Sequence, residues 1–206
     1  MPDIFTLVTP DRFWMFLASG LLLNLTPGAD VMFATASGLR SGPRVGAAAG
    51  LGVGLGGIWH VGLAALGITA LLAALPAALV ALKWLGAAYL LWLAWNSWNA
   101  GAASAAEGGM TAAAAIRRGF LTNALNPKVA LFILAFLPQF TDLRTGPVWQ
   151  QILILGATFT LTGTLVTMAY GALAGLLRKS LASRMSLLNR VAGGMLALMA
   201  VRLVAD

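Results

Sequence analysis

The sequence contains no cysteine, a single histidine and few charged residues of either sign. Without cysteine the chain can form neither a disulfide nor a thiolate-ligated metal site, and one histidine does not suffice for a zinc or copper site built on imidazoles. We therefore expect no metal and no cofactor. Charged residues make up 9% of the chain, against about 25% in a soluble domain. So few charges cannot cover the surface of a soluble protein of this size, which predicts a membrane protein.

Hydrophobic residues make up 60% of the chain and form runs of the length that crosses a bilayer, about 20 residues. We predict one domain, 1–206, with six spans at about 13–38, 45–72, 75–99, 117–139, 149–177 and 187–205. A linker rich in Ala, Gly and Ser, 99–115, separates two halves of three spans each, about 13–99 and 117–205. The basic residues are spread thinly between the runs, without the stripe that marks a nucleic-acid-binding protein, so we expect no nucleic-acid partner.

The basic residues also orient the predicted spans, because cytoplasmic connections carry an excess of Lys and Arg. The connections after the first, third and fifth spans carry Arg40, Arg44, Arg117, Arg118, Arg178, Lys179, Arg184 and Arg190, and the other side carries Arg12, Lys83, Arg144 and Arg202. The richer side should be cytoplasmic, which places the linker in the cytoplasm and both termini outside. The alternative is a five-span chain with one re-entrant segment, which would move one terminus inside.

A short internal repeat joins the two halves. The stretch LTPGADVMF, 25–33, has a counterpart in LNPKVALFI, 125–133, which aligns Pro27 with Pro127 and Thr26 with Asn126. Because each half has three spans, the second half enters the membrane from the opposite side, and the repeat is inverted. The sequence thus predicts an all-α, polytopic membrane protein whose six transmembrane helices form two inverted three-helix repeats. A polar break in the first helix of each half points to a binding site at the membrane midplane.

The two proline motifs should break their helices. Proline removes a backbone N–H and clashes with the carbonyl four residues back, and Gly28 lets the backbone leave helical geometry. Within hydrocarbon the freed polar groups need partners or a wet cavity. Four polar side chains beside the breaks can serve as these partners: Asn24, Thr26, Asn123 and Asn126. The alternative is two proline kinks sealed by neighbouring helices, with no ligand.

Two ionisable residues flank the breaks. Asp30 is the only acid within any predicted span, and Lys128 is the only base well inside one. A charge at the centre of a span costs about 2.5–3.5 kcal/mol, so we expect both to face a cavity or a partner. Lys128 and the amides after Pro27 should hold a substrate carboxylate, and the asparagines its ammonium. Alternatively, Lys128 reaches towards the cytoplasmic interface, or it pairs directly with Asp30.

His60 lies near the middle of the second span, where it either packs against neighbouring helices or relays protons. Asp30 and His60 are therefore the candidates for coupling to a proton gradient. The same span is rich in glycine, and Gly50, Gly52, Gly54 and Gly56 fit the small-xxx-small pattern of closely packed helices. We expect these glycines to face other helices of the same chain. A face for a homodimer is the alternative.

Four stretches resemble the LysE/RhtB family of bacterial amino-acid exporters, and they follow the family's order along the chain: LLLNLTPGADVMF, SGLRSGPRVGAAAGLGVGLGGIWH, LKWLGAAYLLWLAW and RRGFLTNALNPKVALFILAFLPQF. One departure is Ala29, where family members often have proline. The resemblance implies a multi-pass protein of the bacterial inner membrane. It also implies export of an amino acid or derivative, such as homoserine, threonine, lysine or leucine, coupled to protons.

The sequence therefore predicts an exporter of small amino acids and not an enzyme, with protons and the lipid bilayer as its other partners. The predicted substrate site consists of Asn24, Thr26, Pro27, Gly28, Asp30, Asn123, Asn126, Pro127 and Lys128. An ion or metal permease is one alternative, although one Asp and one His are few ligands for a metal cage. A membrane scaffold that transports nothing is the other.

Overall fold

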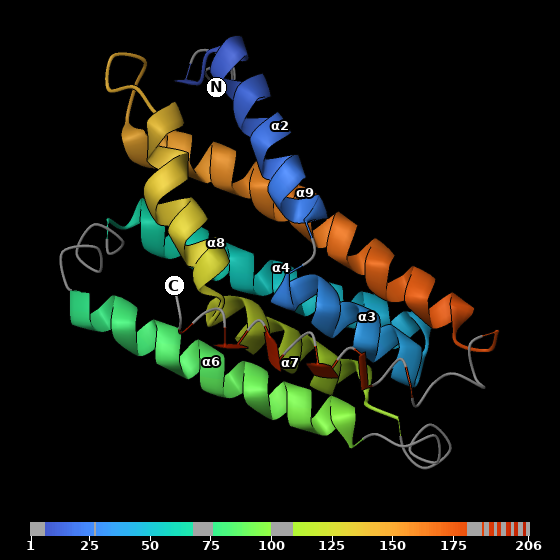
Figure 1. Cartoon of the computed structure of the whole chain (residues 1–206). Helices are drawn as coiled ribbons and strands as arrows, with labels where there is room; N and C mark the ends of the chain where they lie inside the picture. Colours follow the sequence, from blue (N-terminus) through green and yellow to red (C-terminus); the bar gives the residue numbers. More distant parts are fainter. Residues whose placement is uncertain are drawn as a thin grey trace.

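The computed structural model describes residues 7–26, 28–67, 76–99 and 109–180, together with scattered positions from 187 to 204. Pro27 and most of the predicted sixth span thus lie outside the described residues. In the part that is described, all regular structure is helical (Figure 1). This agrees with the all-α fold class that the apolar runs predicted.

Three predicted spans correspond to single helices: α4 (Pro43–Ala65), α6 (Pro76–Trp98) and α9 (Val148–Leu177). The first span is divided into α2 (Pro10–Leu25) and α3 (Ala29–Ser41), which meet at an angle of 49°. The fourth is divided into α7 (Ala112–Ala124) and α8 (Pro127–Leu131), followed by a π-helical turn, η2 (Phe132–Phe136), and a 3-10 turn, η3 (Leu137–Phe140). Both divisions fall where the two proline motifs predicted a break.

Proline sets the start of several of these helices. It occupies the first position of α2, α4 and α8, where its missing N–H would have had no partner in any case. Asn126 accepts a hydrogen bond from the backbone N–H of Lys128 (3.0 Å) and so caps α8. Between α3 and α4 the chain turns at Gly42, whose φ of 94° is in the left-handed region that favours glycine.

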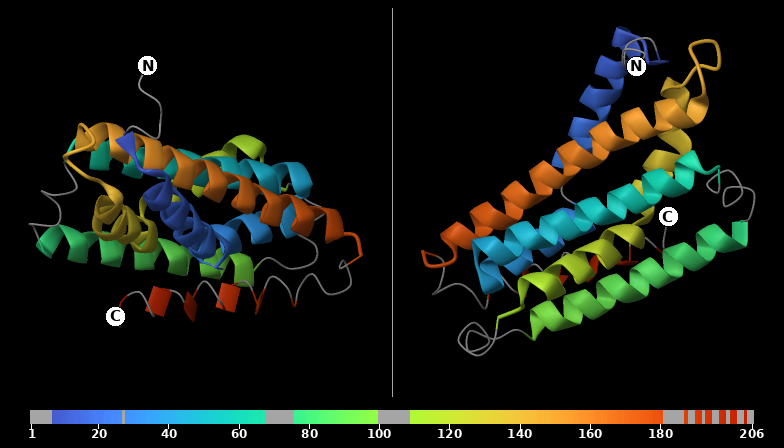
Figure 2. Two further views of the ribbon diagram at one scale, coloured as in Figure 1. Left: turned by 90° about the horizontal axis from the view of Figure 1, so that it is seen from above. Right: turned by 180° about the vertical axis from the view of Figure 1, so that it is seen from behind.

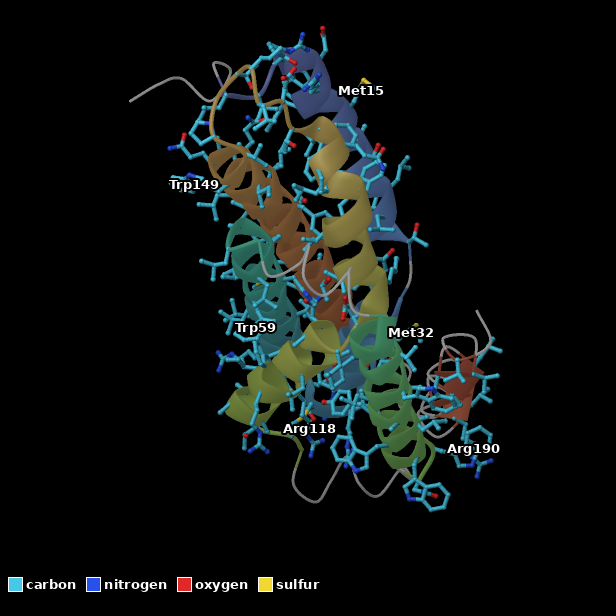
Figure 3. The ribbon with its side chains drawn as sticks, turned by 90° about the vertical axis from the view of Figure 1, so that its left-hand side faces the viewer. Met15, Met32, Trp59, Arg118, Trp149 and Arg190 are labelled. Atoms are coloured by element: carbon cyan, nitrogen blue, oxygen red, sulfur yellow. The ribbon has the colours of Figure 1, made fainter. Side chains whose placement is uncertain are left out.

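Two helices, α4 and α9, are long and apolar enough to cross a membrane, and the bent pair of α2 and α3 makes a third if it is one span. That assignment covers only the described residues, and the full count of six spans stays a prediction. Large apolar side chains on the outer faces fit a lipid environment: Trp59 of α4 is 51% exposed and points away from the other helices (Figure 3).

The helices α9, α4, α7 and α6 lie side by side in that order in two views (Figures 1 and 2). Glycines of α4 let it approach α9 closely. A Cβ added at Gly46 would overlap the backbone of Gly171, and one at Gly50 would lie 2.7 Å from the Cα atom of Met168. The contacts run in opposite directions along the two helices, so α4 and α9 are antiparallel.

A second glycine face of α4 packs against α7. A Cβ at Gly52 would overlap the backbone of Ile116, and one at Gly56 would lie 2.6 Å from the Cβ atom of Asn123. The four glycines of the small-xxx-small pattern are therefore buried against α9 or α7 of the same chain, as the first of the two sequence interpretations held. They are not available as the face of a homodimer.

At the end of the molecule where α2 begins, polar contacts join α2, the connection that contains Asp142, and the start of α9. The guanidinium of Arg12 lies 3.3 Å from a carboxylate oxygen of Asp142. The buried side chain of Gln151, in the first turn of α9, donates to the carbonyl of Asp142 at 2.8 Å. Hydrogen bonds from the Arg144 guanidinium to both oxygens of Asp142 (3.1 and 2.9 Å) hold the pKa of that carboxyl well below its usual range.

The opposite end gathers the segments that carry most of the basic residues. The hydroxyl of Ser41 accepts a hydrogen bond from the backbone N–H of Met110 (3.0 Å), so the end of α3 lies beside the end of the linker. Gly42 lies close to the guanidinium of Arg178, just after α9. Figure 3 likewise draws Arg118 and Arg190 towards the end opposite to Met15. The connections predicted to be cytoplasmic are thus close together in space.

Candidate functional site

The two broken helices meet at a carboxylate. Asp30, in the first turn of α3, accepts hydrogen bonds at Oδ2 from the side-chain amides of Asn123 and Asn126, each at 2.9 Å. Asn123 belongs to the last turn of α7 and Asn126 caps α8, so the break in the second half supplies both donors. The carboxylate also lies at a helix N-terminus, where the partial positive charge of the backbone stabilises an anion.

Lys128 lies across the break in the first half. Its Nζ donates to the carbonyl oxygens of Leu23 and Thr26, each at 3.2 Å. These carbonyls belong to the end of α2, where no further helical N–H can reach them and where a cation is favourable. Between the described side chains of Lys128 and Asp30 no ion pair is formed. Lys128 thus stabilises the broken end of α2, and two of its three N–H donors have protein partners.

Asn24 and Thr26 face different partners. The side-chain amide of Asn24 donates to the carbonyl of Phe159 (3.2 Å) and to the hydroxyl of Thr162 (3.1 Å), which attaches α2 to α9. The hydroxyl of Thr26 donates back to the carbonyl of Leu22 at 2.7 Å. Asn24 therefore holds two helices together, while Thr26 satisfies a carbonyl of its own helix.

His60 supports the site from behind. Its Nε2 lies 2.9 Å from the carbonyl oxygen of Asn123, and its ring is buried. That carbonyl, at the end of α7, also accepts the backbone N–H of Asn126 at 2.8 Å. When Nε2 carries the proton, the imidazole gives this carbonyl a further hydrogen bond and helps to fix the residue that also contacts Asp30.

A pocket opens beside these residues, between α2, α3, α4, α7, α8 and α9. Its empty volume is about 500 Å³, including the part that is open to the outside. Of the residues predicted from sequence, Asn24, Thr26, Gly28, Asp30, Asn123, Asn126 and Lys128 line it. His60 does not line it, Pro127 begins α8 beside it, and Pro27 lies outside the described residues.

The fifth predicted span contributes a wall of the pocket that the sequence did not indicate. Thr160, Thr164 and Thr167 line it together with Gly163 and Phe159, all from α9. Threonine in a helix commonly bonds to the carbonyl four residues back, as Thr164 does to Thr160 at 2.6 Å. Its presence in a span therefore gives no signal of a site. The spacing of 160, 164 and 167 on one helical face was the only available clue.

Three oxygen atoms at the pocket have no hydrogen-bond partner among the described residues: Oδ1 of Asp30, Oδ1 of Asn123 and Oγ1 of Thr160. All three are buried atoms, and buried polar atoms without a partner are uncommon in native proteins. Within the part of the chain that the structure describes, no group of three or more His, Cys, Asp or Glu side chains could hold a metal. The three unpaired oxygens can therefore accept hydrogen bonds, but the described side chains do not gather around them as a metal site.

The sequence profile of a family described as LysE type translocator matches residues 21–206, which include every helix from the middle of α2 onward. The chain belongs to the LysE type translocator family. It is accordingly a membrane protein of a transporter family and not an enzyme.

Relatives of this LysE-type chain include named efflux proteins. An uncharacterized membrane protein of Vibrio cholerae is 34% identical over 188 residues, which cover 88% of this chain and 91% of the relative. The homoserine/homoserine lactone efflux protein of Salmonella typhi is 30% identical over 172 residues, 81% of this chain and 82% of its own. The leucine efflux protein of Enterobacter is 27% identical over 154 residues, 73% of each chain. No solved structure matches.

Proposed function

We propose that this chain is a secondary transporter that exports a small amino acid or amino-acid derivative across the bacterial cytoplasmic membrane in exchange for protons. The observation that carries the proposal is the carboxylate of Asp30, bound by Asn123 and Asn126 at the junction of two broken helices and beside a pocket. Ionisable groups inside a membrane are costly and mark transport pathways and proton relays. Membership of a translocator family supports the same function.

The architecture that we propose is six spans in two inverted three-helix repeats. The antiparallel packing of α4 and α9 supports this alternation of direction, as does the meeting of α3 with α7 and α8 at their breaks. In such transporters the substrate binds at the interface of the repeats, where half-helix ends face the cavity. Rocking of one repeat against the other would then expose this site alternately to the two sides of the membrane.

The names of the relatives suggest the substrate class. Leucine, homoserine and homoserine lactone share an α-ammonium group, whereas the lactone has no free carboxylate. The pocket combines the polar groups at the breaks with apolar side chains, among them Leu23, Val31 and Val129. This combination suits a small molecule with one charged end and a short apolar or weakly polar body.

The proton-coupling group that we propose is Asp30. It is the only carboxylate among the residues that line the pocket, and it would take up a proton from the outside and release it to the cytoplasm. His60, which contacts Asn123 at its carbonyl, is the second candidate. An ion or metal permease would need several ligands converging at the pocket, and a scaffold would not need the buried carboxylate.

The test is an export screen in cells. Cells that overexpress the chain are grown with toxic levels of individual amino acids and analogues, and the compounds that accumulate outside are measured. We expect higher tolerance and faster external accumulation for at least one compound with a primary ammonium group. The matched control is the Asp30→Asn variant at equal membrane abundance, which should lose accumulation against a gradient. A wild-type protein that exports none of the compounds would contradict the proposal.

A further inference from the structure

We propose that Oδ1 of Asp30, Oδ1 of Asn123 and Oγ1 of Thr160 together bind the ammonium group of the substrate, and that this ammonium and the transported proton exclude each other at Asp30. The inference rests on the proposed export function. It assigns the substrate class as primary ammonium compounds, with or without a carboxylate. It also makes Thr160 of α9 a residue that determines specificity.

The three oxygens are all buried and all lack a hydrogen-bond partner among the described residues. All three residues line the same pocket. The side chains are held firmly, since Asn123 is 4% exposed and Thr160 is 8% exposed. Leaving a buried acceptor unpaired is energetically unfavourable. A ligand that donates to all three would recover that cost.

The three side-chain atoms at the pocket that lack a partner can all accept a hydrogen bond, since two are carboxylate or amide oxygens and the third is a hydroxyl oxygen. Both Asn123 and Asn126 use their side-chain amide nitrogen for Asp30, and the oxygen of Asn126 is taken by the backbone N–H of Lys128. The orientation of Asn123 is fixed chemically, because a flipped amide would set its oxygen against the carboxylate. A substrate carboxylate only accepts hydrogen bonds, whereas an ammonium has three N–H donors and no acceptor.

Two consecutive glycines of α4 pack directly against two of the oxygens. A Cβ added at Gly56 would lie 2.8 Å from Oδ1 of Asn123, and one at Gly57 would lie 3.0 Å from Oγ1 of Thr160. Either methyl group would crowd an acceptor that the ammonium is to reach. The glycine pair therefore lets α4 pack closely at this point without crowding either acceptor.

Competition with the proton follows from the chemistry of the carboxyl group. A proton on Oδ1 of Asp30 turns that atom from an acceptor into a donor, so it can no longer bind an N–H of the ammonium. The other ionisable groups of the site are Lys128 of α8, which lines the pocket, and His60 of α4 behind Asn123. From α7 the uncharged Asn123 bonds to Asp30, and from α9 the uncharged Thr160 lines the same pocket. A single carboxylate that holds either a proton or the ammonium exchanges one for the other.

The test measures binding to the purified full-length protein with two matched sets of probes. The first set is leucine, leucine amide and N-acetylleucine, and the second is homoserine lactone with its N-acetyl derivative. In at least one set we expect the compounds with a free ammonium to bind and the acetylated ones to bind at least roughly tenfold more weakly, the effect of losing a hydrogen-bonded charge. For the compound that binds, the apparent Kd should rise as the pH is lowered.

The variants separate recognition from folding. Thr160→Val should weaken binding of the ammonium compound roughly tenfold or more, and Thr160→Ser, which keeps the hydroxyl, should restore it. Thr158→Val on the same helix is the control, because the hydroxyl of Thr158 bonds to its own helix at Ile154 and the residue does not line the pocket. Its binding should equal that of the wild type, as should the thermal unfolding temperatures of all three variants.

Four results would overturn the inference. If an amino acid is exported but its acetylated form binds equally well, or if Thr160→Val binds it like the wild type, the ammonium site is wrong while the export function stands. If Na⁺ alone stabilises the wild type against thermal unfolding and ammonium compounds do not, the oxygens hold an inorganic cation instead. If the cell screen finds no export at all, the proposed function fails and the inference fails with it.

Discussion

Replacing Asp30 with asparagine or with alanine separates the charge of this side chain from its hydrogen bonds. Asparagine keeps the shape and an oxygen that can accept from the amides of Asn123 and Asn126, which now bond to Oδ2 at 2.9 Å. Alanine removes that acceptor and leaves two donors unpaired. Both asparagines are buried, at 4% and 7% exposure, so water does not readily replace the lost partner.

We expect the two substitutions to change the free energy of unfolding in different ways. In Asp30→Ala, two buried donors without partners cost about 1–3 kcal/mol each, or about 2–6 kcal/mol together. In Asp30→Asn, two charge-assisted bonds become neutral ones, a loss of about 1 kcal/mol each. Against this stands the removal of a buried charge, whose desolvation costs several kcal/mol. We therefore expect Asp30→Asn to be as stable as the wild type or more stable, and Asp30→Ala to be clearly less stable.

The assay is thermal unfolding of the purified variants in one detergent at neutral pH, with the amount of folded protein in the membrane as a second readout. The order of unfolding temperatures should be Asp30→Asn at or above the wild type, and Asp30→Ala well below both. If Asp30→Asn unfolds at as low a temperature as Asp30→Ala, the charge itself holds the fold together. The carboxylate would then be structural, and the argument that it is kept for transport would fail.

Three further predictions concern the frame around the site. Gly46→Ala should prevent close packing of α4 on α9 and sharply reduce the amount of folded protein in the membrane. Gly62→Ala, whose added Cβ meets nothing within 4 Å, should be tolerated. Fluorescence-detected gel filtration compares the two variants. Because the folded-state pKa of Asp142 is lowered, its charge stabilises the fold above the ordinary carboxyl pKa of about 4, and the difference in unfolding temperature from Asp142→Asn should shrink as the pH falls below that value. Reporter fusions should place the linker 99–115 in the cytoplasm and the connection 140–148 outside, and finding both on one side would exclude the inverted repeat.

The helix breaks were predictable from sequence because their cause is local. A proline without an N–H interrupts a helix wherever it stands, and Asn126 beside Pro127 is a helix cap by type and position. The repeat then indicated that the two breaks belong together. That Asp30 and Lys128 need partners also followed from the cost of charge in a membrane.

The partners themselves depended on the tertiary arrangement. Asp30 could have bonded to Lys128, and only the packing of α3 against α7 and α8 gives its Oδ2 to Asn123 and Asn126. Lys128 is predicted to hold a substrate carboxylate, which stays a prediction, and the sequence did not indicate that its Nζ also bonds to two carbonyls of α2. No sequence rule distinguishes between the alternative partners of Asp30 or of Lys128, because each of them would stabilise the charge equally well in principle. Thr160 was missed for the same reason, since its relevance comes from facing α4 at Gly57.

The central claim is that Asp30 couples export to the proton gradient. Its most direct test uses purified wild-type protein and Asp30→Asn in lipid vesicles, loaded with the amino acid that the cell screen identifies. We expect an imposed pH step to drive uphill transport by the wild type. Asp30→Asn should give none, although exchange of labelled for unlabelled substrate without a gradient can persist. Uphill transport by Asp30→Asn at the wild-type rate would contradict the account, and His60 would become the coupling candidate.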